Sequence, residues 1–421
     1  MELTIKNIGK IANADIKLNG ITVVAGENNT GKSTIGKVLY SYFSSCYNLN
    51  SQILKTKISG LTRSLELEFN NSSYLFDSDE IARKLFQTKG KFTGNYIDLL
   101  DRYMYTSDGS SASPADMCEY AEIIKDKYDS YYNATNEAIM LNVITKKMKT
   151  EFNNQINNIF SLDKSSSFCL KIQNEKYEVQ IEDNMAKSIS NFNSLYTQAV
   201  YIDDPNVLDN CTGWRFFPTR RYLNNNHRND LVNKILQKKS DQDVENALNE
   251  IISNDTFESI FELIDPICAG NIDYSSNILT IKNEDYEPID VRNLSTGLKS
   301  FVILKTLILN GWIENNGTII LDEPETHLHP QWQLVFAELI VLLQKKWNLH
   351  ILINTHSPYF LNAIQVFSAK HSIADKCNYY LSENKGNVSD VSDVTDNVEL
   401  IYKKLSRPLQ TLENERYGIY D

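Results

Sequence analysis

Long hydrophobic runs, closely spaced cysteines and low-complexity tracts are all missing from this sequence of 421 residues. No stretch of eighteen apolar residues occurs, so we expect no segment that spans a membrane. The six cysteines are far apart, which fits neither a zinc site nor a disulfide framework. The start of the chain, Met1 to Lys6, alternates polar and apolar residues and lacks the apolar core of a signal peptide. We therefore expect a cytoplasmic location.

Basic side chains are outnumbered, with 42 Lys and Arg against 54 Asp and Glu and a formal net charge of −12. This balance argues against a protein that coats nucleic acid without preference, but it leaves a local basic face open. The strongest basic and aromatic cluster is Trp214-Arg215-Phe216-Phe217 with Arg220-Arg221 and His227-Arg228. Such a cluster can contact phosphates or a partner, although a solvated face with buried rings is the commoner outcome in a helical segment.

The N-terminal pattern predicts strands around a glycine-bearing loop. Alternation of apolar and polar residues indicates the strands, and an Asn-Gly pair is a hairpin signal. The expected elements are strands over 2–8, 14–18 and 21–25, a hairpin turn at Asn19-Gly20, a helix from about Lys32 to Tyr47, and further short strands within 51–77.

From about Ser78 the pattern is mainly helical. Apolar residues recur every three or four positions from Tyr120 to Phe160, which predicts one amphipathic helix of about forty-five residues that starts after Ser113-Pro114, with Asp116 as its cap. The remaining expected elements are a strand pair at about 168–182, helix over 225–264, strands at about 271–274 and 278–282, a helix ending at Leu309, strands over 318–321 and 350–354, and a helix near 331–346.

Strand–helix–strand alternation with continuously apolar strands indicates a parallel sheet that is covered on both faces. We therefore expect an α/β protein with a mixed sheet core and an inserted, mainly helical lobe. The sheet-bearing head is expected at 1–77 and 266–421, and the lobe with its short strand pair at 78–265.

Residues 26–33 form the strongest motif, because they follow a buried strand, open a helix and fit the pattern G-x-x-x-x-G-K-[ST]. Glycines let successive N–H groups face one anion, Lys32 supplies a charge for the β- and γ-phosphates, and the Ser33 hydroxyl is a hard ligand for Mg²⁺. The residues concerned are Gly26, Glu27, Asn28, Asn29, Thr30, Gly31, Lys32, Ser33 and Thr34. An ordinary glycine turn before a helix is the plain alternative.

An apolar strand over 318–321 ends in Asp322-Glu323-Pro324-Glu325. A carboxylate at the end of such a strand lies beside the phosphate loop in an open α/β sheet. Asp322 is therefore a predicted partner of Mg²⁺, through water, and Glu323 is predicted to orient or deprotonate the attacking water. A solvated acidic turn is the alternative. A metal site at His327 and His329 is disfavoured because Mg²⁺ prefers oxygen ligands.

A further anion site is predicted at Ser295, a plausible N-cap of the helix that follows. The Ser-Thr-Gly sequence from Ser295 to Gly297 is commonplace before a helix, but it lies 27 residues before Asp322. His356 follows the apolar strand 350–354, where a simple hydrogen-bonded histidine is the commoner case.

Together these segments resemble the motifs of ABC ATPases. Residues 26–33, 294–299, 322–325 and 355–358 look like the Walker A, signature, Walker B and switch-histidine motifs. More narrowly, the opening segment and Asp322 to Pro330 are similar to the RecF/SMC/OLD-like branch found in DNA repair and anti-phage defence. The resemblance covers roughly 1–45 and 270–365.

The resemblance implies an ABC-type P-loop ATPase head that binds ATP and Mg²⁺ and hydrolyses ATP. It also implies a homodimer, or a higher oligomer, in which Ser295 and Gly297 act in trans on the γ-phosphate held by the other chain. His356 would sense that phosphate, and Lys32, Glu323 and His356 are the predicted catalytic residues. The signature departs from the transporter form, and no Gln-bearing loop can be placed; Asp203-Asp204-Pro205 is a guess for part of that lobe.

Three relatives of this type are disfavoured. A transporter subunit would not separate Lys32 and Ser295 by 263 residues, and a full SMC protein would carry far longer heptad segments. An OLD nuclease would need a Toprim domain after His356, where 65 residues follow without an evident spaced acidic triad. We expect no nuclease within the chain.

Two functional hypotheses remain. In the first, the chain is a homodimeric sensor ATPase that controls a separately encoded effector, similar to the ATPase subunits of Septu- and PARIS-like anti-phage systems. In the second, it is a DNA-binding ATPase of RecF-like repair or recombination, whose ATP-driven closure clamps duplex DNA. Neither hypothesis includes a membrane partner.

Overall fold

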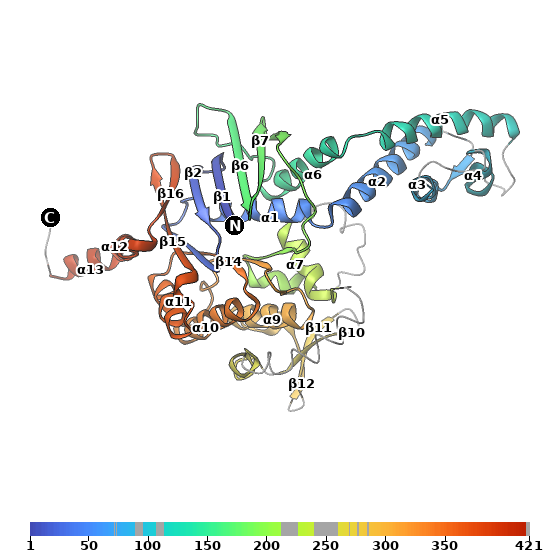
Figure 1. The fold of residues 1–421 in the computed structure, drawn as a ribbon. Helices are drawn as coiled ribbons and strands as arrows, with labels where there is room; N and C mark the ends of the chain where they lie inside the picture. The colour runs from blue at the N-terminus through green and yellow to red at the C-terminus, as the bar shows by residue number, and fades with distance from the viewer. Residues whose placement is uncertain are drawn as a thin grey trace. The chain divides into compact units, whose positions relative to one another are not determined.

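The computed structural model describes residues 1–70, 72, 74–88, 96–106, 113–211, 226–239, 260–268, 270–275, 278–283 and 286–417. The chain divides into two compact units (Figure 1). Unit 1 comprises Met1–Ser45, Ile144–Phe192 and Thr197–Asp421, and unit 2 comprises Cys46–Val143 and Asn193–Tyr196.

A mixed sheet forms the centre of unit 1. Among the described residues its eleven strands follow the order β8-β7-β6-β1-β2-β16-β15-β3-β14-β13-β9. The strands are β1 (Glu2–Ile8), β2 (Ile11–Lys17), β3 (Ile21–Gly26), β6 (Ser165–Ile172), β7 (Glu175–Glu182), β8 (Met185–Ile189), β9 (Ala199–Ile202), β13 (Thr318–Asp322), β14 (His350–Thr355), β15 (Cys377–Lys385) and β16 (Val388–Asp393).

The two ends of this sheet differ in strand direction. From β15 through β3, β14 and β13 to β9, every neighbouring pair is parallel. At the other end β1, β2, β6, β7 and β8 pair antiparallel. Because parallel strands end at the same edge, the carboxyl ends of β3, β14, β13 and β9 meet at one edge, where ligands bind in open α/β sheets.

Helix α1 (Lys32–Cys46) packs against both ends of the sheet. The Tyr42 ring lies 6.0 Å from Phe168 on β6 and 5.7 Å from Tyr177 on β7. On another side of the helix, a Cβ at Gly36 would lie 2.9 Å from Ile320 Cγ2 on β13. The sheet therefore curves around α1. These contacts hold the first residue of the helix, Lys32, at the edge where the parallel strands end.

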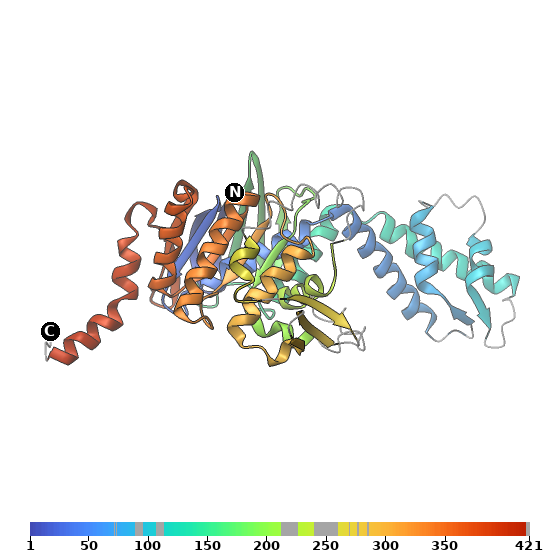
Figure 2. The same cartoon turned by 90° about the horizontal axis from the view of Figure 1, so that it is seen from below.

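Three helices cover the other face of the parallel strands: α9 (Thr296–Leu309), α10 (Pro330–Trp347) and α11 (Pro358–Lys370) (Figure 1). Figure 2, seen from below, shows them side by side in front of the strands. Alternate strand residues such as Ile21, Val23 and Ile353 share one buried cluster with Phe301 and Phe336 from the helices. Burial of this apolar surface stabilises the layer that holds the site.

The other elements of unit 1 are shorter. They are the 3-10 helices Pro205–Cys211, Val291–Asn293, Ala374–Lys376 and Thr395–Asn397, the helices α7 (His227–Leu236), α12 (Glu399–Leu405) and α13 (Arg407–Tyr417), and a small antiparallel sheet of β10 (Asn271–Ser275), β11 (Ile278–Asn283) and β12 (Tyr286–Asp290).

Unit 2 is mainly helical and has its own buried cluster, to which Leu61, Leu65, Ile81, Leu99 and Ile124 belong. Its elements are α2 (Leu49–Phe69), α3 (Ser78–Gln87), α4 (Tyr96–Tyr103), α5 (Pro114–Tyr132) and the short pair β4 (Tyr74–Phe76) and β5 (Met104–Thr106). Helix α6 (Asn136–Glu151) follows, and the division between the units falls within it, after Val143.

The prediction of short strands within 51–77 is wrong for most of that range, because α2 extends from Leu49 to Phe69. Ile53, Leu61, Leu65 and Phe69 are four or eight positions apart and are buried along one helix face. Within the described residues of 51–77, only Tyr74–Phe76 is a strand.

The single long helix predicted from Pro114 to Phe160 is also wrong, because the chain forms α5 and α6 with a break at 133–135. Ser113, and not Asp116, caps α5 by accepting a hydrogen bond from the Asp116 N–H. Asn153 and Asn154 have positive φ angles of 50° and 67°, which end the helical path after α6.

Three further expectations differ from the structure. The strand pair at 168–182 belongs to the large sheet as β6 and β7, so the lobe predicted at 78–265 does not coincide with unit 2. Asn19-Gly20 does not form a hairpin, because β16 and β15 lie between β2 and β3 in the sheet. Of the helix predicted over 225–264, α7 ends at Leu236 and residues 240–259 lie outside the described residues.

The predicted fold class is confirmed: the chain is an α/β protein with a mixed sheet, and helices lie against both faces of its parallel strands. No helix within the described residues combines the length and the apolar character needed to cross a membrane.

Candidate functional site

The loop over 26–34 joins β3 to α1 and has a backbone that requires glycine at two positions. A Cβ at Gly26 would lie 2.4 Å from Ser382 O, and Gly31 has a φ of +86°. Asn29 also has a positive φ, 59°. Ser382 Oγ on strand β15 donates to Thr30 O over 2.7 Å, so a hydrogen bond from β15 stabilises the loop. The first N–H groups of α1 lack partners within the helix, which makes this loop an anion site.

The Lys32 side chain lies inside this loop and is only 4% exposed. Its Nζ donates to Gly26 O over 3.0 Å and to Glu27 O over 2.8 Å, and lies 4.0 Å from Glu323 Oε1. Burial lowers the pKa of Lys32, whereas the Glu323, Asp322 and Glu325 carboxylates act in the opposite direction. The ammonium is thus held where a phosphate on the loop would lie.

Asp322 ends β13 at the edge shared by the parallel strands. Its Oδ1 accepts from Asn354 Nδ2 on β14, and its Oδ2 accepts from the Tyr201 hydroxyl on β9, each over 3.0 Å. Neighbouring strands on both sides therefore fix the plane of this carboxylate. Motif patterns in the sequence did not indicate Tyr201 or Asn354, because their role depends on strand order.

Glu323 is a non-glycine residue in the left-handed region, with a φ of 51°. Its N–H donates to Asn354 O over 2.8 Å, which holds the turn against β14. Strained backbone of this kind is concentrated at functional sites. The Glu323 side chain lies 3.5 Å from His356 Nδ1. Contact with His356 is the largest cause of a lowered pKa for Glu323, and contact with Glu323 raises the pKa of His356.

Glu325 has a different environment, because its side chain is buried. Its Oε1 accepts from Thr355 Oγ1 over 2.5 Å and from the His356 N–H over 3.3 Å. Burial raises the pKa of Glu325 despite these hydrogen bonds. The residue anchors the end of β14 and the backbone of His356.

A pocket of about 410 Å³ lies at the ends of the strands. Ser33, Asp322 and Glu323 line it, as do Asp203 and Arg228, and all of these residues belong to unit 1. The segment Asp203-Asp204-Pro205, which the sequence left as a guess, thus lies beside Asp322. Arg228 donates to Asp203 Oδ2 over 2.7 Å, so the ends of β9 and α7 are tied together.

This pocket fits a hydrated Mg²⁺ ion. The Ser33 hydroxyl and the Asp322 carboxylate are hard oxygen ligands, and this ion keeps several waters. Asn354 Oδ1 is buried and has no hydrogen-bond partner among the described residues. The same amide donates through its Nδ2 to Asp322 Oδ1, so this unpaired acceptor lies next to the Asp322 carboxylate.

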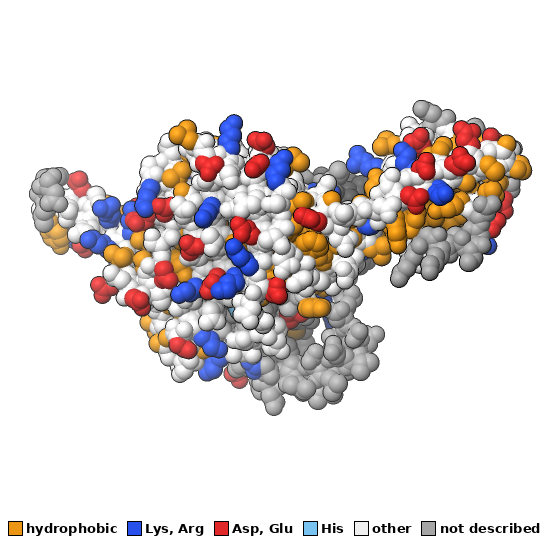
Figure 3. Space-filling model, turned by 45° about the horizontal axis from the view of Figure 1, so that its top comes forward, with side chains coloured by type: hydrophobic (Ala, Val, Ile, Leu, Met, Phe, Trp, Pro, Cys, Tyr) orange, Lys and Arg blue, Asp and Glu red, His pale blue; other side chains and the backbone are white. Residues whose placement is uncertain are grey.

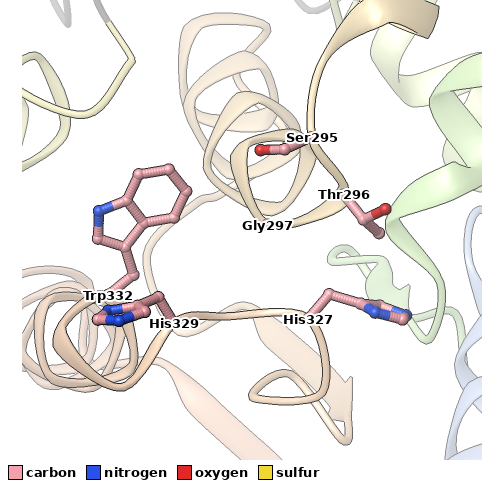
Figure 4. A pocket seen from close by; sticks show the side chains of 6 residues that line it. All are labelled: Ser295, Thr296, Gly297, His327, His329 and Trp332. Carbon is pink, nitrogen blue, oxygen red and sulfur yellow. The ribbon is translucent and has the colours of Figure 1, made fainter.

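Ser295 and Gly297 line a second, open pocket of about 490 Å³ together with Thr296, His327, His329 and Trp332 (Figure 4). Ser295 Oγ caps α9 by accepting from the Leu298 N–H over 3.4 Å, as predicted. A Cβ at Gly297 would lie 2.8 Å from His327 O, so glycine is required for this close approach. None of the loop residues 26–34 lines this pocket.

His327 lines both pockets, whereas His329 lines only the second. His329 is the N-cap of α10, and its Nδ1 accepts from the Gln331 N–H over 3.4 Å. Both rings are exposed. Among the described residues, no group of three or more His, Cys, Asp and Glu side chains is arranged to hold a metal ion directly.

Most of the predicted basic and aromatic cluster, including Trp214, Arg220 and Arg221, lies outside the described residues. Of its described members, His227 is buried and Arg228 lines the first pocket. On the face shown in Figure 3, lysine and arginine side chains of unit 1 are interspersed with acidic ones.

Residues 1–361 match the family model described as "AAA ATPase domain". A relative described as the probable ATPase of retron Vc95, from Vibrio cholerae serotype O1 biovar El Tor, is 26% identical over 147 residues, which are 32% of this chain and 28% of that protein. The SMC head domain from Thermotoga maritima matches with a TM-score of 0.38 and 10% identity, over 93% of this chain and 98% of that chain.

A second solved structure, the Smc head domain with an extended coiled coil bound to the C-terminal domain of ScpA, derived from Pyrococcus furiosus, has a TM-score of 0.41 and 11% identity, over 99% of this chain and 98% of that chain. The family model covers far more than half of the chain and spans the phosphate loop, Ser295, Asp322 and His356. The chain therefore belongs to the AAA ATPase domain family.

Proposed function

We propose that the chain binds ATP with Mg²⁺ on the loop over 26–34 and hydrolyses it between two copies of itself. Lys32 contacts the β- and γ-phosphates, and Ser33 and Asp322 hold the hydrated ion. The ion, when bound, neutralises charge on the phosphate oxygens. The buried Lys32 and the fixed plane of Asp322 support these roles.

In the reaction a water oxygen attacks the γ-phosphorus while the bond to the β–γ bridging oxygen breaks. Glu323 orients this water and accepts its proton, and His356 contacts the γ-phosphate. A lowered pKa keeps Glu323 ionised and therefore able to accept a proton at neutral pH. His356 Nδ1 lies 3.5 Å from Glu323 Oε1. A γ-phosphate that contacts His356 therefore also lies close to the Glu323 carboxylate.

The observation that carries the two-chain proposal is that Ser295 and Gly297 lie in a different pocket from the phosphate loop, although His327 lines both pockets. Ser33 of the loop, Asp322 and Glu323 line one pocket, whereas the pocket at Ser295 and Gly297 includes no residue of the loop. The N-terminus of α9 offers N–H groups and a hydroxyl to an anion. The second copy brings that anion, as the γ-phosphate on its own loop, so that each chain completes the other's site.

We further propose that ATP turnover regulates a separately encoded effector in an anti-phage system. A relative described as a probable retron ATPase supports this assignment over a DNA-clamping role. The net charge of −12 also favours a protein partner over a DNA duplex.

Glu323→Gln tests this proposal. The variant keeps the side-chain volume and loses the proton acceptor, so we expect turnover to fall about 100-fold while ATP still binds. Sedimentation velocity should then show a dimer with ATP and Mg²⁺ and a monomer after EDTA is added. Glu399→Gln, at the start of α12, is the matched control. Normal turnover by Glu323→Gln, or the absence of an ATP-dependent dimer, would show the proposal to be wrong.

A further inference from the structure

We propose that Tyr201 and His227 are positioning residues, which hold Asp322 in place and connect it to the end of helix α6. This inference rests on the metal role proposed above for Asp322. Neither residue lines the pocket at Asp322, so both act through other side chains.

Tyr201 holds Asp322 directly. It is 2% exposed and lies on β9, whose parallel register with β13 places it opposite Ile320, two residues before Asp322. Its hydroxyl donates to Asp322 Oδ2, while Asn354 donates to the other oxygen. Without Tyr201, one carboxylate oxygen loses the donor that fixes its direction toward the pocket.

His227 holds Tyr201 and two carboxylates. Its ring stacks on the Tyr201 ring, with centroids 4.3 Å apart and an angle of 22° between the planes. Its Nδ1 lies 2.5 Å from Glu151 Oε2, and its Nε2 lies 2.9 Å from Asp203 Oδ2. The His227 N–H also donates to Glu151 Oε1 over 2.8 Å. His227 is 6% exposed, so these contacts are shielded from solvent.

These contacts form a continuous path from α6 to the metal pocket. Glu151 is the last residue of α6, His227 is the first residue of α7, and Asp203 lines the pocket beside Asp322. A buried charge that loses one of its partners is costly, so Glu151, His227 and Asp203 move together and do not separate. The position of the α6 end therefore sets the position of Tyr201 and, through it, of Asp322.

Outer groups that orient a ligand typically change metal affinity or activity 10- to 100-fold when they are removed. Tyr201→Phe removes only the hydroxyl and keeps the ring that stacks on His227. We expect this variant to bind Mn²⁺ about 10-fold more weakly, measured by electron paramagnetic resonance with a non-hydrolysable ATP analogue present. Its affinity for a fluorescent ATP analogue in EDTA should stay within about 2-fold of the wild type, because the phosphate loop is unchanged.

The control is Tyr196→Phe, since Tyr196 is 84% exposed. Thermal melting of both variants checks that they are folded. If Tyr201→Phe binds Mn²⁺ as tightly as the wild type, the inference is wrong while the proposed function stands. If the wild type binds no Mn²⁺ with nucleotide, the proposed function fails, and this inference fails with it.

Glu151→Gln tests the link to α6 and serves as a second variant. It keeps a hydrogen-bond acceptor for His227 but removes the charge, so we expect Mn²⁺ affinity to fall about 3- to 10-fold. The matched control is Glu338→Gln, because Glu338 Oε1 lies 2.9 Å from His371 Nε2 in a similar pair elsewhere in unit 1. Unchanged Mn²⁺ affinity in Glu151→Gln would remove α6 from the path.

Discussion

The two pockets of unit 1 are built differently. In the pocket at Asp322, the carboxylate is fixed by donors from two neighbouring strands, and the nearby Lys32 is buried inside its loop. In the pocket at Ser295, exposed imidazole rings and a helix N-terminus surround an open space of about 490 Å³. The groups of the pocket at Asp322 are preorganised within the chain, whereas the exposed groups of the pocket at Ser295 are free to bind an anion that another molecule supplies.

This difference indicates that the two pockets contribute differently to nucleotide binding and to turnover. Binding of nucleotide should depend on the preorganised pocket, because its groups need no partner to be in place. If the proposed two-chain site is right, turnover should depend on both pockets, because the open one would contact the nucleotide of a second chain. Substitutions in the two pockets should therefore separate binding from turnover.

Lys32→Ala should have the largest effect, since it removes the charge at the phosphates. We expect turnover to fall about 1,000-fold and nucleotide binding to weaken strongly. Equilibrium binding of a fluorescent ATP analogue and phosphate release measure the two quantities. Lys345→Ala, an exposed change on α10, is the control. Turnover within about 10-fold of the wild type would exclude Lys32 from the site.

Ser295→Arg should reduce turnover without weakening nucleotide binding. A bulky cation at the start of α9 obstructs the open pocket, so we expect turnover to fall about 100-fold. Nucleotide affinity in EDTA should stay within about 2-fold of the wild type, because the phosphate loop belongs to the other pocket. Ser51→Arg, at an exposed position in the first turn of α2, is the control. A parallel loss of binding would mean that the pockets are not independent.

His227→Gln tests stability beside the preorganised pocket. Burial alone would lower the pKa of His227, but its contacts with Asp203 and Glu151 raise it to about 9. Because the pKa of His227 in the folded chain lies above the ordinary histidine value of 6.5, the stabilisation is complete below pH 6.5 and is lost as pH rises through about 9. The wild type should lose up to about 3 kcal/mol of unfolding free energy over this window, and the variant should not.

Denaturant unfolding at pH 6.5 and at about pH 9 measures this loss of unfolding free energy. The groups around the His227 ring are Glu151, Asp203, Tyr201 and Tyr40. None of them is changed in the variant, so the pH slope isolates the imidazole. If the unfolding free energy of wild type and variant depends equally on pH, the charged form of His227 does not stabilise the fold.

His329→Ala should have the smallest effect. The side chain caps α10 through the Gln331 N–H, so its loss should cost about 0.5–1 kcal/mol of stability. We expect turnover to change less than about 3-fold, because the proposed phosphate contacts come from Ser295 and the N-terminus of α9 and not from His329. Melting curves and phosphate release measure both. A loss as large as that of Ser295→Arg would place His329 on the nucleotide.

The site residues that the sequence predicts lie in short contiguous motifs. The loop over 26–34 and the carboxylates after β13 follow from glycine positions, an apolar strand and the helix start, which are local properties. Tyr201 and Asn354 were not predicted, and His227 was predicted only as part of a basic and aromatic cluster, because β9, β14 and α7 meet only through the order of strands and helices in three dimensions.

Errors in the predicted fold have the same origin. The sequence pattern predicts short strands within 51–77, yet tertiary packing of one face makes Leu49–Phe69 the helix α2. The hairpin at Asn19-Gly20 was expected from a local turn signal, but β15 and β16, from the other end of the chain, occupy the place beside β2 and β3. Local patterns cannot report such long-range insertions.

The most direct test of the two-chain site is to mix Lys32→Ala with Ser295→Arg, each of which is inactive alone. In a mixed dimer one site combines both defects, while the other combines an intact loop with an intact Ser295. Random pairing should then restore about a quarter of wild-type turnover, since half of the dimers are mixed and each keeps one good site. A mixture that stays as inactive as its components would contradict the account.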